Sequence, residues 1–144
     1  MVTPQEVATK LHSVSGRGCI AVTGSGIQAI SDLFSEPGAS RTILEAYVPY
    51  SHKALEEFVG VAADQHVSAQ EAQLMARAAL ARAKHLADGN EDDEPLFGVG
   101  CTAAVATDRV RRGKDRAHIA WATETRSGGA SVWFDKQVRS RADE

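Results

Sequence analysis

The stretch Cys19-Ile20-Ala21-Val22-Thr23-Gly24-Ser25-Gly26 decides the fold class of this chain. It is a short apolar run that ends in a loop of glycines and hydroxyls, and a helix-like segment, 27–34, follows at once. A continuous apolar run is typical of a strand buried on both faces, as in the parallel sheets of α/β proteins. The stretch therefore predicts a strand, a tight loop and a helix in that order.

The loop itself has two interpretations that the local sequence leaves open. Backbone N–H groups at the start of a helix are unpaired, the helix dipole is positive there, and glycine lets a ligand approach closely. On this interpretation the loop binds an anion, and the hydroxyls of Thr23 and Ser25 orient a ligand or attack it. The alternative interpretation is a tight strand-to-helix turn without a ligand.

The composition indicates one compact domain, 1–144, with a single core. The chain has 144 residues, of which 43% are hydrophobic, and a pI near 5.9, and such a length suits one domain. No stretch is apolar for long enough to cross a bilayer, and residues 1–6 do not resemble a signal peptide. We therefore expect a cytoplasmic protein without a membrane partner.

The charged and sulfur-containing residues exclude several kinds of site. The net charge of −3 argues against general nucleic-acid binding. Cys19 and Cys101 lie in apolar runs and do not form a CxxC pair, so we expect buried thiols, no metal and no cofactor. A basic run, 109–116, lies between two expected strands, where Arg109 could hold a phosphate.

Helix and strand signals alternate along the chain. Two S/T-x-x-E capping boxes, Thr3–Glu6 and Ser68–Glu71, begin helices over 4–15 and 69–87, and the longer helix is rich in alanine, which suggests close packing on a sheet. Further helices are expected at 27–35 and 52–58, and strands at 19–22, 42–48, 96–101, 117–123 and 130–134. Ser127-Gly128-Gly129 is a hairpin signal. The pattern predicts an α/β fold, a three-layer helix–sheet–helix sandwich with a mixed sheet.

The order of segments is similar to that of a known family. After the glycine loop come Pro37-Gly38-Ala39-Ser40, a strand, Tyr50-Ser51, and Val67-Ser68 at the start of the alanine-rich helix. This order resembles the C-terminal domain of the CinA family, competence/damage-inducible protein A, over roughly residues 6–135. The most specific part of the resemblance is the PGAS block with its spacing to Tyr50-Ser51.

The resemblance implies an amidase. Amidases of this family convert nicotinamide mononucleotide and water to nicotinate mononucleotide and ammonia, with a serine–lysine pair. Their motifs read roughly A-E-S-C-T-G-G, Y-S-x-x-x-K and T-G-x-A-G-P. A hydroxyl needs a nearby base to become a nucleophile, and a desolvated lysine can act as that base. Backbone N–H groups of the loop would then hold the developing oxyanion.

The chain matches these motifs only in part. Counted back from Pro37, the nucleophile position falls on Thr23 and the loop threonine on Ser25. Leu55 occupies the lysine position, and the nearest amine belongs to Lys53, about 200° away around a helix axis. The third motif reads Gly100-Cys101-Thr102-Ala103-Ala104, without the GP turn.

The resemblance and the loop together give a list of candidate residues. The candidate catalytic residues are Thr23, Ser25 and Lys53, with His52 as an alternative base. The candidate substrate-binding residues are Gly24, Gly26, Tyr50, Ser51, Cys101, Thr102 and Arg109. His12, His66 and His85 show no ligand spacing.

Two functions remain open on the sequence. One is a nicotinamide-nucleotide amidase, on nicotinamide mononucleotide or another amide, and the other is a pyridine-nucleotide-binding or assembly module that has lost catalysis. The resemblance also implies that the chain forms a homo-oligomer.

Overall fold

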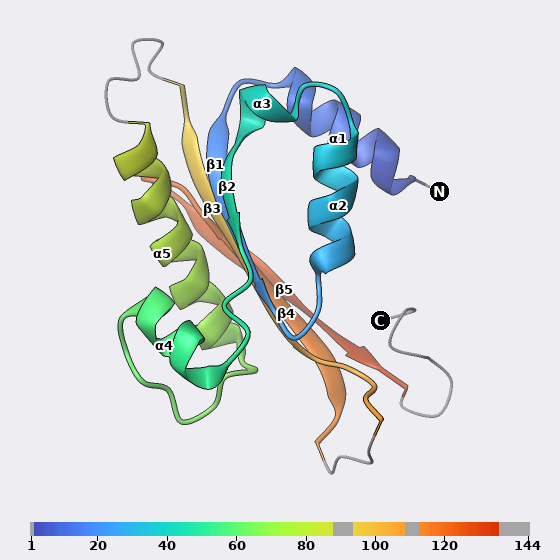
Figure 1. The fold of residues 1–144 in the computed structure, drawn as a ribbon, viewed down its shortest axis with the longest axis vertical. Coiled ribbons are helices and arrows are strands. Elements are labelled where there is room, and N and C mark those ends of the chain that lie inside the picture. The colour runs from blue at the N-terminus through green and yellow to red at the C-terminus, as the bar shows by residue number, and fades with distance from the viewer. Residues whose placement is uncertain (1, 88–93, 109–112, 136–144) are drawn as a thin grey trace.

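The computed structural model of the chain describes residues 2–87, 94–108 and 113–135 (Figure 1). The helices and strands follow one another in this order: α1 (Pro4–Ser13), β1 (Arg17–Thr23), α2 (Ile27–Ser35), α3 (Ala39–Thr42), β2 (Ile43–Tyr47), α4 (His52–Val59), α5 (Ala69–Leu86), β3 (Leu96–Ala104), β4 (Asp115–Ala122) and β5 (Ser127–Phe134). None of the helices in these residues is long and apolar enough to cross a membrane.

The strands form one mixed sheet in the order β2-β1-β3-β4-β5. β1 pairs in parallel with β2 and with β3, whereas β3–β4 and β4–β5 are antiparallel. Helices α4 and α5 lie on one side of the sheet, and α1, α2 and α3 lie on the other (Figure 1). The predicted three-layer α/β sandwich with a mixed sheet is confirmed.

The α5 helix packs closely on the centre of the sheet, as its alanines predict. On one side its residues Ala72, Ala76 and Leu80 pack with Ala120 and Ala122 of β4. The strand beneath the helix, β3, has Gly98 and Gly100 on the face that α5 covers. A side chain at Gly98 or Gly100 would overlap the α5 backbone, which shows how near the helix axis lies to β3.

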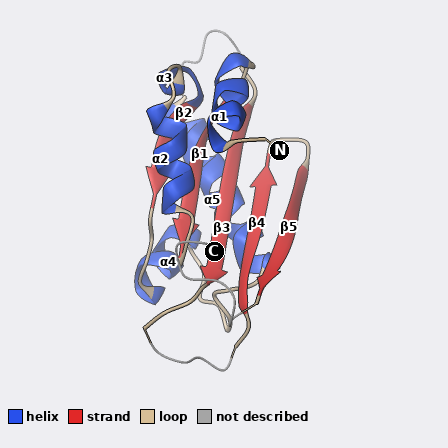
Figure 2. Cartoon of the chain, turned by 90° about the vertical axis from the view of Figure 1, so that its right-hand side faces the viewer, coloured by secondary structure: helices blue, strands red, loops and turns tan. Residues whose placement is uncertain are grey.

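The helices on the other side leave part of the sheet uncovered. Figure 2 shows α1 and α2 in front of β1, β2 and β3, with β4 and β5 to one side of them. Three apolar side chains are consequently exposed there, those of Ile119, Trp121 and Val132. The homo-oligomer that the resemblance implies stays a prediction.

Several predicted boundaries differ from the structure by a few residues, and side-chain contacts explain two of the differences. Residue Thr42 ends the short helix α3 and does not begin a strand, because its buried hydroxyl lies 2.7 Å from Nδ1 of His12. Gly128 and Gly129 belong to β5, and the hairpin turn lies at 123–126. A side chain at Gly128 would collide with the Trp121 ring, so this glycine makes room for a neighbour across the sheet.

Only one of the two predicted capping boxes forms. At α1, Thr3 and Glu6 exchange both hydrogen bonds, as predicted. At α5, the Ser68 hydroxyl accepts a hydrogen bond from the Glu71 N–H at 3.0 Å, but the Glu71 carboxylate does not return to Ser68. That carboxylate is turned into the protein, where Glu71 is 1% exposed.

Gly98→Ala should destabilise the protein by about 1–3 kcal/mol, because the new methyl group must push α5 away from β3. Gly113→Ala is the matched control, since a methyl group there meets only one atom within ordinary contact distance. Urea unfolding of both variants measures the difference. Equal stability of Gly98→Ala and the unmodified chain would contradict the close approach of helix and strand.

Candidate functional site

The loop after β1 lies where the parallel strands end. Ligand sites of open α/β sheets form at this edge, outside the carboxyl ends of the strands. The loop borders a hollow of about 100 Å³. Its lining residues come from the loop and from the segment after β2: Val22, Thr23, Gly24, Ser25, Ile27, Val48 and Tyr50. The structure thus brings together four of the predicted site residues, namely Thr23, Gly24, Ser25 and Tyr50.

Two glycines give the loop its shape. Gly24 has φ +80°, and a side chain there would overlap the Ala103 carbonyl of β3. Gly26 has φ +110° and caps α2 without a side-chain hydrogen bond. The first turn of α2 contains no acidic residue. The first N–H groups of α2 and its positive dipole end are therefore available to an anion.

The Thr23 side chain points to the α4–α5 side of the sheet. Side chains alternate along a strand, and in β1 the residues Ile20 and Val22 pack on the α2 side, whereas Cys19 and Ala21 pack against α4 and α5. Thr23 continues the second row and is 7% exposed. Within the described part of the chain its hydroxyl makes no hydrogen bond, which leaves it able to contact a ligand.

The register partner of Thr23 on β3 is Thr102. Its side chain is completely buried, and its Oγ1 donates a hydrogen bond to the His66 carbonyl at 2.6 Å. This bond ties the segment before α5 to the end of the sheet. Thr102 does not line the hollow, and its predicted role in substrate binding stays a prediction.

The structure does not bring Lys53 to the loop. Lys53 lines a separate open depression with residues of α4 and the segment after it: Glu56, Glu57, Gly60, Val61 and Ala62. Leu55, which occupies the lysine position of the resemblance, is 2% exposed and packs between Ala21 and Met75. Leu55 thus belongs to the core between the sheet and the helices α4 and α5.

Tyr50 and Ser51 have different surroundings. Tyr50 lines the hollow and is 59% exposed, so it can contact a ligand there. Ser51 caps α4, and its hydroxyl accepts a hydrogen bond from the Ala54 N–H at 3.1 Å. This bond gives Ser51 a structural role, whatever it does toward substrate.

Cys101 faces away from Thr102. It packs on the α2 side with Ile20 and Val22, and burial raises the pKa of its thiol to about 11. At neutral pH it is a neutral thiol and a poor nucleophile. Arg109 lies outside the described residues.

A cluster of titratable side chains lies at the α5 N-terminus and was not predicted from the sequence. His66 lies between two carboxylates, with its Nδ1 3.7 Å from Oε2 of Glu71 and its Nε2 3.7 Å from Oε1 of Glu56. The ring of His52 packs on that of His66 with centroids 4.3 Å apart. No three such groups in the described ranges converge as metal ligands would. The Ser68–Glu71 spacing was the available signal, but it was interpreted as a helix cap.

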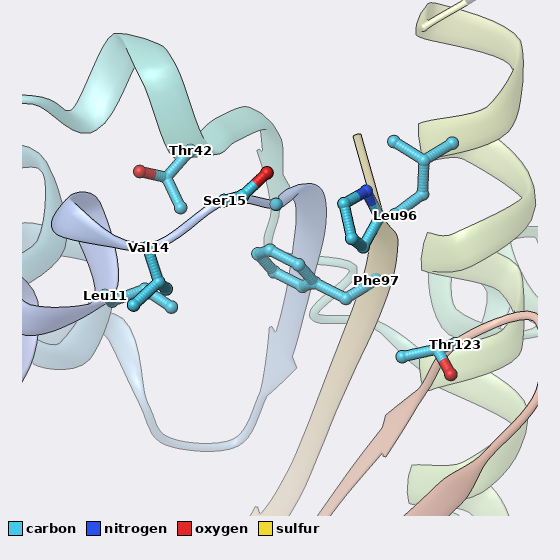
Figure 3. Close-up of a pocket in the computed structure, with 9 residues that line it drawn as sticks. Leu11, Val14, Ser15, Thr42, Leu96, Phe97 and Thr123 are labelled. Atoms are coloured by element: carbon cyan, nitrogen blue, oxygen red, sulfur yellow. The ribbon is translucent and has the colours of Figure 1, made fainter. Parts of the chain in front are cut away.

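A second hollow, of about 120 Å³, lies at the opposite end of the strands, near the start of β3 (Figure 3). Leu11, Val14, Leu96 and Phe97 form much of its wall. None of its lining residues carries a titratable side chain. The hollow at the Thr23 loop is therefore the better candidate for chemistry.

No protein-family model and no curated protein matches the chain. Solved structures do match it. A CinA superfamily protein from Enterobacter cloacae is 18% identical, with a TM-score of 0.75, over 99% of this chain and 83% of that one. A competence/damage-inducible protein from Agrobacterium tumefaciens is 18% identical, with a TM-score of 0.72, over 99% and 88%. One from Enterobacter asburiae is 17% identical, with a TM-score of 0.74, over 99% and 89%. Over nearly its whole length, the chain has the fold of the CinA superfamily structures.

Proposed function

We propose that this chain binds a nicotinamide nucleotide at the loop between β1 and α2. The observation that carries the proposal is the hollow at that loop, which Gly24 and Gly26 shape beside the uncapped N-terminus of α2. Amides at a helix N-terminus suit a phosphate. The CinA-type fold and the resemblance of the motifs support a pyridine nucleotide as the ligand.

The size of the hollow suggests how such a ligand lies. About 100 Å³ holds one phosphate-sized group and is well below the volume of an ordinary pocket for a whole small molecule. The remainder of the nucleotide therefore lies across the open edge of the sheet. Tyr50 is at that edge, with a ring on which the pyridine can stack.

Hydrolysis of the nicotinamide carboxamide is the second candidate. It does not use the serine–lysine pair of the related amidases, because Leu55 is in the core and Lys53 is in another depression. One observation favours it nevertheless. The buried Thr23 hydroxyl has no hydrogen bond in the described residues and stands at the position of the family's nucleophile.

Calorimetry with nicotinamide mononucleotide should detect binding to the unmodified chain. Tyr50→Ala should weaken this binding about tenfold, because loss of an aromatic contact of this kind costs about 1 kcal/mol or somewhat more. Phe34→Ala is the matched control, an exposed aromatic residue near the far end of α2. Absence of heat with the folded, unmodified protein would exclude this ligand.

Lys53→Ala should leave both the affinity for nicotinamide mononucleotide and any release of ammonia unchanged, because Lys53 lines a different depression from the one at the loop. If the chain is an amidase, Thr23→Val should abolish ammonia release, since valine keeps the shape and removes the hydroxyl. An enzyme-coupled ammonia assay measures both variants. Loss of turnover in Lys53→Ala would restore the serine–lysine type of mechanism.

A further inference from the structure

Glu71 and Thr23 occupy matching positions on two elements packed against each other. Along α5, residues 71, 75, 79 and 83 form one row, with a rise of about 6 Å per step. Along β1, residues 19, 21 and 23 form one row, with a rise of about 6.6 Å per step. Ala79 and Ala83 pack on Cys19, and Met75 packs on Ala21. One further step along both rows leads from the Met75–Ala21 contact to Glu71 on α5 and Thr23 on β1.

The surroundings of the Glu71 carboxylate differ from those of a carboxylate that only stabilises the fold. The residue is 1% exposed, and among the described residues neither carboxylate oxygen has a hydrogen-bond partner, although His66 Nδ1 lies 3.7 Å from Oε2. Leaving a buried polar group without a partner costs about 1–3 kcal/mol, and more when the group is charged. A helix cap at Ser68 was available to it and is not used. Orphaned buried groups of this kind are typical of functional sites.

We propose that Glu71 is the proton acceptor for the Thr23 hydroxyl, which makes Thr23 a nucleophile without a lysine. In the attack, Thr23 Oγ1 bonds to the carbon of a carboxamide, and its proton passes to the Glu71 carboxylate. Glu71 then returns the proton to the departing nitrogen, which leaves as ammonia. Water hydrolyses the resulting ester, so that amide and water give acid and ammonia. The natural reaction rests on the proposed site, but the Glu71–Thr23 pairing does not depend on the identity of the ligand.

Neighbouring charges tune Glu71 for this role. Burial raises the pKa of the Glu71 carboxyl, His66 opposes the rise, and Glu56 of α4 adds to it. The His52 ring packs on the His66 ring. On the β4 side, Arg116 donates a hydrogen bond to the Val67 carbonyl at 3.1 Å. A carboxyl whose pKa is moved toward neutrality accepts a proton more readily than an ordinary glutamate.

The test uses an organophosphorus probe, diisopropyl fluorophosphate, so that it needs no nucleotide. An activated Thr23 bonds to phosphorus, fluoride leaves, and the proton goes to Glu71. Peptide mass spectrometry should find the label on Thr23, at a rate that rises as pH increases through a value above 4.5, because only the ionised carboxylate accepts a proton. A protein that is not labelled at Thr23, or is labelled at Ser25 instead, would overturn the inference.

In the variant Glu71→Gln, the probe should label Thr23 at least a hundredfold more slowly, because a general base usually accelerates a reaction by at least that factor. Glu57→Gln, an exposed carboxylate on α4, is the matched control and should label at the normal rate. Glu71→Asp keeps the negative charge on a shorter side chain, so Thr23 should be labelled slowly in this variant as well. Labelling of Glu71→Gln at the rate of the unmodified chain would contradict the role of Glu71.

Folding and binding controls separate this inference from the proposed function. Because the native state holds the Glu71 proton more tightly than the unfolded chain, the ionised group costs stability at pH 8. Glu71→Gln should therefore melt at the same temperature as the unmodified protein or higher at pH 8. Calorimetry with nicotinamide mononucleotide then reports on the ligand alone. If the probe labels Thr23 but the protein does not bind the nucleotide, the proposed ligand is wrong and the proposed role of Glu71 still stands.

Discussion

The close contact between α5 and the centre of the sheet is the constraint on which the rest of the structure depends. Small residues permit it from both sides, with alanines along the helix and Gly98 and Gly100 on the strand beneath. Because the helix backbone lies directly on β3, its rows of side chains fit the rows of the strands in one register. That register decides which residue of α5 lies over each residue of β1.

The same contact places the chemistry of the molecule. It sets the N-terminal turn of α5 over the carboxyl end of β1, where the strand leaves the sheet for the glycine loop. Thr23 faces the α4–α5 side of the sheet, and Gly24 and Gly26 turn the chain away toward α2. The proposed site uses two kinds of group. The amides of α2 suit an anion, and the buried carboxylate of Glu71 suits a proton transfer.

Local sequence signals predicted most of the fold because each depends on neighbours in the chain. The apolar run before Thr23, the Thr3–Glu6 cap and the alanine pattern of α5 each became the element expected. The signals failed where a distant residue competed. Gly128 was interpreted as a turn but makes room for Trp121, and Glu71 was interpreted as a cap but lies buried beside His66.

The sequence by itself determined the α/β class, the order of the elements, and the glycine loop with its two hydroxyls. Periodicity, capping and glycine act over a few residues, so they can be seen in the chain. Only the tertiary structure decided which side chains meet at the loop. It put Leu55 in the core, placed Lys53 at a different depression and buried Glu71 beside His66. These placements depend on how helices settle on the sheet, and spacing along the chain does not specify that packing.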